Sequence, residues 1–149
     1  MNNDLKPGKD YVWVGGGVLI FNENGEALLM RRGKRSKNEA GWWSKPGGTI
    51  DYGETAVGAM EREIKEEVDI EIEIWGLLPH TDHLIEGEDQ HWLSINFLAD
   101  LKSGAPKIME PEKCEEIGWF RLDQLPEKLT KTTREPIKYY LEGKYISFR

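Results

Sequence analysis

The sequence predicts a mixed α/β or α+β fold. Segments with strand composition lie on both sides of a strongly amphipathic helical stretch, and a second helical stretch lies near the carboxyl terminus. No internal repeat or Pro/Ser-rich linker divides the chain. Its 149 residues match the length of one ordinary domain, so we expect residues 1–149 to form a single domain.

The first half of the chain begins with a predicted β-hairpin. Residues Tyr11–Phe21 are rich in valine, isoleucine and aromatic side chains, and a second apolar run covers Ala27–Met30. The four residues Asn22–Gly25 between them have turn composition. Three later segments also have strand composition: Ile70–Trp75, Trp92–Leu101 and Ile117–Leu122.

Two segments have helical periodicity. Apolar residues recur every three or four positions over Ala56–Val68, where Thr55 is the favoured N-cap and Asp51 a second candidate. The second helix is predicted over Thr133–Glu142, with Pro136 tolerated near its start. Strands on both sides of a central helix therefore give the mixed α/β class.

Charge and composition exclude several classes of partner. The chain carries 27 acidic and 20 basic residues, a net charge of −7, which disfavours contact with a nucleic acid polymer or an anionic membrane. Its longest uncharged run, Tyr11–Asn22, is too short to span a membrane as a helix. We expect a cytoplasmic protein, because residues 1–10 are polar and lack an apolar stretch, and because the lone Cys114 cannot form an internal disulfide. The sequence leaves the oligomeric state open, with a homodimer among the alternatives.

Three glutamates on the first helix suggest a cation site. Glu63, Glu66 and Glu67 are three and four residues apart, so they lie on one face and repel one another by about 0.2–0.5 kcal/mol per pair on an isolated helix. A hard divalent cation reverses that repulsion because it prefers carboxylate oxygens. The alternative is a solvent-exposed charged face, supported by Arg62 and Lys65.

The glycine-rich segment before this helix favours a ligand beside the backbone. Its glycines allow a tight path, and its carbonyl groups could face a metal. Gly48-x4-Gly53-Glu54-Thr55 nearly matches a P-loop, but Glu54 replaces the phosphate-binding lysine and inverts the charge. Gly15–Gly17 fails the dinucleotide fingerprint because Ile20 occupies the third glycine position.

The segment Gly48-x5-Glu54-x7-Arg62-Glu63-Ile64-Lys65-Glu66-Glu67 resembles the Nudix box, G-x5-E-x7-R-E-U-x-E-E-x-G-U, in which U is a bulky apolar residue. Ile70 fills the final U, and the flanking segments 28–32, 41–48 and 110–120 look like those of MutT-type proteins. The resemblance implies an α/β/α sandwich with a catalytic loop, helix and loop. It also implies hydrolysis of a nucleoside diphosphate linked to another group, with nucleoside triphosphate to monophosphate and pyrophosphate as the favoured reaction.

The resemblance also implies the metal and its ligands. Mg²⁺, replaceable by Mn²⁺, would polarise the phosphoryl oxygens and lower the pKa of the attacking water. Glu63 is in addition the candidate general base. The implied ligands are the carboxylates of Glu63, Glu66 and Glu67 and the carbonyl of Gly47 or Gly48.

Four further residues have implied roles around that metal. Arg62 would orient a catalytic glutamate, and Glu54 would brace the loop or reach the metal through water. A glutamate after the box often completes such a site, and Glu112 and Glu115 are the candidates.

Candidate substrate contacts lie outside the box. Arg31 and Arg32 begin a basic run that ends at Lys37 and either meets a triphosphate or is a solvent-exposed loop. Lys45 stands where relatives often have an apolar residue, so its stem would pack and its ammonium reach water or phosphate. Trp92 either stacks on a nucleobase or belongs to the core.

Two absent residues and one replacement refine the expectation. The alternative enzymes cleave ADP-ribose or another nucleoside diphosphate sugar, and their resemblance implies a proline near Ile85, which is absent. Dinucleoside polyphosphate hydrolases carry a tyrosine that would fall near positions 86–88, and it is absent as well. An inactive nucleotide-binding module is disfavoured by the intact glutamates. Asp69 replaces the box glycine that ends the helix with a positive φ, which aspartate tolerates better than most residues.

Overall fold

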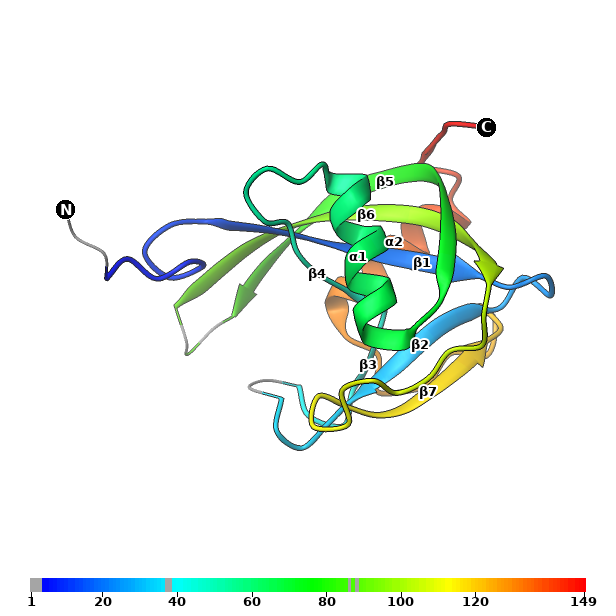
Figure 1. The fold of residues 1–149 in the computed structure, drawn as a ribbon, viewed down its shortest axis with the longest axis horizontal. Coiled ribbons are helices and arrows are strands. Elements are labelled where there is room, and N and C mark those ends of the chain that lie inside the picture. Colours follow the sequence, from blue (N-terminus) through cyan, green and yellow to red (C-terminus); the bar gives the residue numbers. More distant parts are fainter. Residues whose placement is uncertain (1–3, 37–38, 86, 88) are drawn as a thin grey trace.

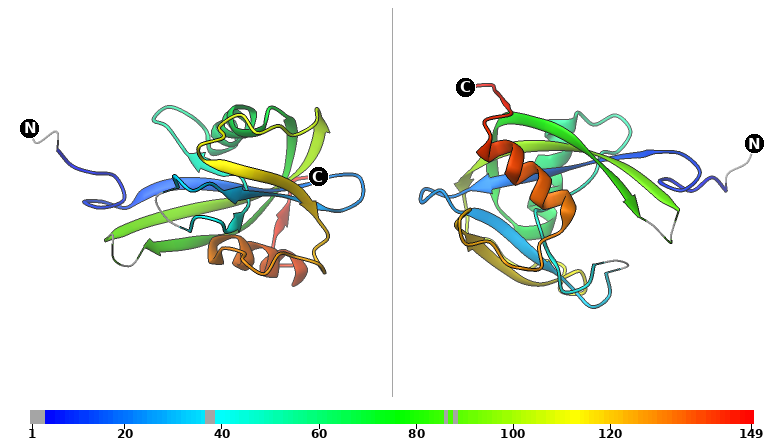
Figure 2. Two further views of the ribbon diagram at one scale, coloured as in Figure 1. Left: turned by 90° about the horizontal axis from the view of Figure 1, so that it is seen from below. Right: turned by 180° about the vertical axis from the view of Figure 1, so that it is seen from behind.

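The computed structural model describes residues 4–36, 39–85, 87 and 89–149. It consists of one mixed sheet with a helix packed on each face (Figures 1 and 2). This α/β/α arrangement confirms the predicted fold class. In chain order the elements are β1 (Trp13–Phe21), β2 (Ala27–Arg32), β3 (Trp43–Ser44), β4 (Gly47–Thr49), α1 (Ala56–Val68), β5 (Glu71–Ile85), β6 (Gln90–Ser103), β7 (Cys114–Phe120), α2 (Lys131–Leu141) and β8 (Ile146–Ser147).

The sheet is built around β1. Its order is β3-β2-β1-β6-β5-β8, while β4 pairs with β1 and β7 pairs with β2. Strands β1 and β6 run parallel, with Trp13 opposite Trp92 and Phe21 opposite Asp100, and the other pairs of these strands are antiparallel. The first half of the sequence thus folds onto the second half at the centre of the sheet.

Local signals produced the hairpin as predicted. Phe21 and Ala27 are partners across β1 and β2. The Asn22 side-chain oxygen accepts hydrogen bonds from the Asn24 and Glu26 amides at 3.0 and 2.9 Å. An asparagine that caps its own turn explains why the chain reverses here.

Helix α1 has the bounds that its periodicity predicts. The Thr55 hydroxyl accepts a hydrogen bond from the Gly58 amide at 3.0 Å, so Thr55 is the N-cap and Asp51 is not. The helix ends at Asp69 in the left-handed conformation, with φ 56° and ψ 48°. Aspartate therefore adopts the backbone that the box glycine would adopt.

Asp69→Gly is expected to leave the melting temperature unchanged or slightly higher. Glycine enters the left-handed region without a Cβ clash. The change also removes two exposed ion pairs, from Asp69 to Lys65 at 3.0 Å and to Lys107 at 3.5 Å, but such pairs contribute little. Thermal unfolding of the two proteins checks this, and a clear drop would show that the lysine contacts outweigh the backbone strain.

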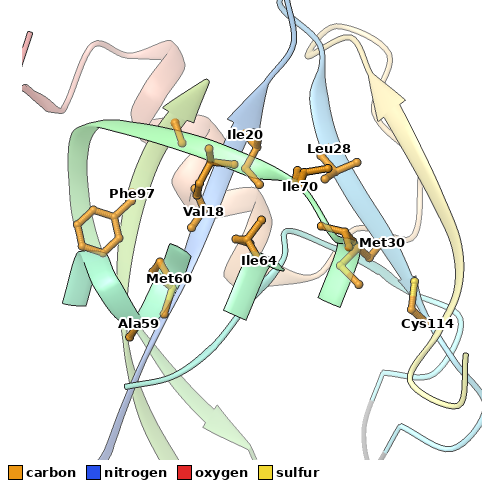
Figure 3. Packing of buried hydrophobic residues seen from close by; sticks show 13 residues of the cluster. Val18, Ile20, Leu28, Met30, Ala59, Met60, Ile64, Ile70, Phe97 and Cys114 are labelled. Atoms are coloured by element: carbon orange, nitrogen blue, oxygen red, sulfur yellow. The ribbon is translucent and has the colours of Figure 1, made fainter. Parts of the chain in front are cut away.

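Two hydrophobic clusters hold the helices on the sheet. On the α1 side, Met60, Ile64 and Val68 are fully buried against strand residues such as Val18 and Ile20 (Figure 3). The α2 side contains a second cluster around Leu19, Leu29, Leu98 and Ile137. Because the apolar stripe of α1 faces the sheet, its glutamates lie along the edge of that contact.

Several element bounds differ from the sequence prediction. Strand β5 continues beyond Trp75 through Pro79 to Ile85, because it forms a long antiparallel hairpin with β6 that three register shifts interrupt. These irregularities break the alternating pattern that reveals a strand. Helix α2 begins two residues before Thr133, so Pro136 lies inside the helix rather than near its start.

Within the described residues, neither helix is long and apolar enough to cross a membrane.

Candidate active site

Glycines bring strand β4 close to both β1 and α1. Gly47 pairs with Gly17, and a Cβ atom on Gly47 would overlap the Gly16 carbonyl oxygen. A Cβ atom on Gly48 would instead overlap the carboxylate of Glu63. The backbone of β4 therefore lies directly against the acidic face of α1, as the sequence suggested for a ligand-bearing loop.

Arg62 forms a bidentate ion pair with Glu54. Its Nε donates to Glu54 Oε2 and its Nη2 to Glu54 Oε1, both at 2.7 Å. The Asp51 amide also donates to Glu54 Oε1 at 3.0 Å. The hydrogen bonds from Arg62 lower the pKa of Glu54 to about 2. Glu54 is thus a permanently charged brace between the loop and the helix.

The rest of the Arg62 guanidinium holds the acidic face together. Nη1 donates to Glu63 Oε1 at 3.2 Å and to Glu66 Oε2 at 3.3 Å. Nη2 donates to the Thr49 carbonyl at 3.2 Å. One arginine therefore connects the end of β4, the loop and two of the three glutamates.

Glu67 is the most buried carboxylate of the group. Burial raises its pKa to about 8, helped by the negative charges of Glu63 and Glu110, although the Gly47 amide donates a hydrogen bond to it. Its Oε1 atom is buried and has no hydrogen-bond partner among the residues that the structure describes. Burial likewise raises the pKa of Glu63. A carboxylate oxygen left in this state favours a positively charged ligand.

These residues fit a hard divalent cation. The donors are carboxylates and backbone carbonyl groups, and Glu67 Oε1 is an unsatisfied buried oxygen. In the part of the chain that the structure describes, no three acidic, histidine or cysteine side chains stand in ligand geometry together. Arg62 lies between Glu63 and Glu66 as their counter-charge. A cation at Glu67 would have to share these carboxylates with Arg62.

The segment after β6 departs from the sequence prediction. Glu115 Oε2 lies 3.4 Å from Arg31 Nη2, and Glu115 Oε1 accepts from the Lys34 amide at 3.2 Å. Arg31 also lies 3.4 Å from Glu116. The predicted substrate arginine and a predicted metal glutamate are therefore paired with each other. Of the glutamates in this segment, Glu110 is the one whose charge raises the pKa of Glu67, and the sequence did not point to it.

Arg32 and Trp92 interact with residues outside α1. Arg32 ends β2 and, after the stronger effects of His83, contributes to the lowered pKa of Glu39. Trp92 is half-buried, its ring centroid 5.7 Å from that of Trp13. Its Nε1 donates to Gln90 Oε1 at 3.0 Å. The Trp92 ring thus already takes part in packing, while Lys37 of the basic run lies outside the described residues.

Lys45 points to α2, on the other face of the sheet from the glutamates. Its amide donates to the Thr133 hydroxyl at 2.9 Å, and its ammonium donates to the Thr132 carbonyl. Burial lowers the pKa of Lys45 to about 8, and Glu135 opposes this shift. Thr132 is four residues before Pro136, which has no amide hydrogen to donate. Lys45 therefore satisfies the carbonyl that the proline leaves free.

The destabilisation by Lys45→Met should shrink when Pro136→Ala is also present. The proline-to-alanine change gives Thr132 an intrahelical amide partner, so losing the Lys45 ammonium leaves no unpaired carbonyl. We expect a coupling of about 1 kcal/mol, one hydrogen bond, in a double-mutant cycle of urea unfolding. Additive effects would show that the ammonium contributes nothing at this carbonyl.

Comparisons with known proteins agree with this geometry. The model of the NUDIX domain family matches residues 13–140. A solved structure of a MutT NUDIX hydrolase from Burkholderia pseudomallei has 39% identity and a TM-score of 0.80, covering 86% of this chain and 97% of that one. An uncharacterized Nudix hydrolase of Listeria innocua, lin0387, is 30% identical over 87% of this chain and 85% of its own.

One similar curated protein carries a more specific name. The 8-oxo-dGDP phosphatase NUDT18 of Mus musculus is 33% identical over 75% of this chain. The match covers 33% of that protein, so this chain corresponds to about a third of its length. Because the family model covers most of the sequence and the box residues surround Arg62 and Glu67, the chain belongs to the NUDIX domain family.

Proposed function

We propose that this protein is a divalent-metal-dependent hydrolase of nucleoside diphosphates linked to another group. The observation that carries the proposal is the unpartnered buried oxygen of Glu67 beside Glu63 and the β4 backbone. A buried carboxylate oxygen without a partner costs free energy, and a bound cation would satisfy it. The name of the MutT NUDIX hydrolase at 39% identity supports the same activity.

Different residues have different proposed roles around the cation. Glu63, Glu66 and Glu67 would hold Mg²⁺ or Mn²⁺, together with a carbonyl of Gly47 or Gly48. The bound ion supplies polarisation of the phosphoryl oxygens and acidification of water. Glu63, whose pKa burial raises, is the proposed general base for that water.

Arg62 and Glu54 position this machinery. The bidentate pair at 2.7 Å fixes the guanidinium, whose remaining N–H groups orient Glu63 and Glu66. A planar fork of donors suits this double task, and lysine would not replace it. Because Lys45 and Trp92 are engaged elsewhere in the fold, their proposed substrate contacts would require side-chain rearrangement.

Nucleoside triphosphates are proposed as the favoured substrates, with monophosphate and pyrophosphate as products. In ¹⁸O-labelled water, attack at the β-phosphorus would place the label only in pyrophosphate, and attack at the α-phosphorus would place it in the monophosphate. We expect the β-phosphorus, as the MutT resemblance implies. Mass spectrometry of the products decides between the two.

A substrate panel tests the assignment more broadly. Since one relative is named an 8-oxo-dGDP phosphatase, the panel should contain nucleoside diphosphates and their oxidised forms beside the triphosphates. ADP-ribose represents the alternative enzymes. Turnover of ADP-ribose far faster than every triphosphate would overturn the substrate proposal and leave the metal chemistry intact, whereas no turnover of any member would favour a nucleotide-binding module.

A further inference from the structure

Asp51 lies in the connection between β4 and α1, where the sequence made it a candidate N-cap (Figure 1). The structure gives the cap to Thr55, so the Asp51 carboxylate is left for another contact. The Asp51 amide donates to Glu54 Oε1 at 3.0 Å, which fixes the backbone of the connection. The side chain is 61% exposed and therefore extends, free to adjust, from a fixed point of the loop.

The Asp51 carboxylate contacts the guanidinium of Arg62. Its Oδ2 atom lies 3.4 Å from Arg62 Nη2. Its Oδ1 atom accepts a hydrogen bond from the Thr49 hydroxyl at 3.4 Å, and the Thr49 carbonyl accepts from the same Nη2 atom at 3.2 Å. The end of β4 and the loop thus hold Asp51 on the side of the guanidinium that carries Nη2.

The contacts of Arg62 with carboxylates fall into two groups. Nη1 donates to Glu63 and Glu66, which are both proposed ligands of the cation. Nε and Nη2 face Glu54 and Asp51, which are not among the proposed ligands. In the described structure one guanidinium therefore has four carboxylates beside it, two of which the divalent ion needs as well.

Cation binding requires Glu63 and Glu66 to turn away from Arg62. The guanidinium keeps its charge, because arginine stays protonated in proteins. Its remaining counter-charges are then Glu54 and Asp51. Glu54 already accepts two hydrogen bonds at 2.7 Å, whereas the Asp51 contact at 3.4 Å is long and can shorten because the side chain is exposed. Asp51 is thus the carboxylate placed to take up the charge that the two glutamates release.

We propose that Asp51 is a positioning residue, which holds the Arg62 guanidinium on the loop side and frees the two glutamates that Nη1 contacts. Without Asp51, Arg62 keeps a stronger hold on both glutamates, and a cation competes with it less well. Asp51 is not a metal ligand in this proposal, because it acts only through Arg62. The inference rests on the proposed function, since it needs a cation at these glutamates.

Binding of Mn²⁺ without substrate tests the proposal, measured by the electron paramagnetic resonance signal of the free ion. Asp51→Asn should weaken Mn²⁺ binding about threefold to fivefold, the factor that an exposed ion pair provides. Asp51→Glu keeps a carboxylate at this position and should restore the affinity to within about 1.5-fold of wild type. Glu61→Gln removes an exposed charge from α1 and should also leave the affinity within about 1.5-fold. Circular dichroism confirms that each variant is folded.

A relocated charge separates the contact with Arg62 from a general charge effect. The separation is needed because burial raises the pKa of Glu63 and the Asp51 charge adds a smaller effect, so Asp51 also acts through space. The Tyr52 side chain is fully exposed, so Tyr52→Glu returns a negative charge to the loop without disturbing the packing. In the Asp51→Asn background, Tyr52→Glu should leave the Mn²⁺ affinity low.

Three results would contradict the proposal. Recovery of Mn²⁺ affinity in the double variant would show that only the charge of the loop matters, which overturns the role through Arg62. An affinity of Asp51→Glu as low as that of Asp51→Asn would show that the carboxylate is not what matters. Wild-type affinity of Asp51→Asn would overturn the role of Asp51 altogether if Glu67→Gln still abolished binding. Wild-type affinity of Glu67→Gln would instead overturn the proposed function itself.

Discussion

Glu67→Gln is expected to lower kcat at least about a hundredfold while the protein stays folded. The amide keeps the shape of the side chain but cannot act as an anionic ligand, and it fills a buried position where the carboxylate oxygen has no partner. Glu66→Gln should have a similar effect on kcat. Steady-state rates with saturating Mg²⁺ and the best substrate of the panel provide the measurement.

Two controls accompany this experiment. Glu61→Gln changes an exposed glutamate on the same helix and should leave kcat unaltered. Excess chelator should abolish wild-type activity, and Mg²⁺ or Mn²⁺ should restore it. Full activity in chelator would exclude the metal-dependent mechanism.

Gly48→Ala is expected to reduce kcat about a hundredfold with little change in melting temperature. The new Cβ atom would stand where the Glu63 carboxylate lies, and that flexible side chain can move aside at low cost to stability. Displacing Glu63 removes both a proposed ligand and the proposed base.

Gly47→Ala is the matched comparison. Its Cβ atom would meet the Gly16 backbone, which cannot move without disturbing β1, so we expect a loss of stability of about 1–3 kcal/mol. Combining Gly48→Ala with Glu63→Gln should add little to either change alone. Independent, additive losses would mean that Gly48 acts through something other than Glu63.

Local patterns predicted the helix that carries the box glutamates. The bounds of α1, its cap at Thr55 and the left-handed Asp69 all depend on neighbouring residues, so one stretch of sequence contains the information. The hairpin at Asn22 likewise depends on residues that are neighbours in the sequence. The family pattern then placed Arg62 among its glutamates.

Tertiary pairing determined what the sequence did not reveal. The connection after β6 docks on the end of α1 through backbone hydrogen bonds to the Glu67 and Val68 carbonyls, a contact that spacing from the box does not reveal. Lys45 faces α2 because a proline inside that helix leaves a carbonyl free. Neither relation is visible in periodicity or composition, since the partners are far apart along the chain.

The central parallel pair has a consequence for the kinetics of folding. Trp13 of β1 lies opposite Trp92 of β6, residues separated by 79 positions (92 minus 13). Such contacts form slowly because a long loop must close first. Strand β4, which lies beside the α1 glutamates, pairs with the other edge of β1 and is much closer to it in the sequence, with Gly17 opposite Gly47. We therefore expect the helix, with β4 close to it in the sequence, to form early, and the centre of the sheet on which the helix packs to be completed later, when β1 and β6 meet.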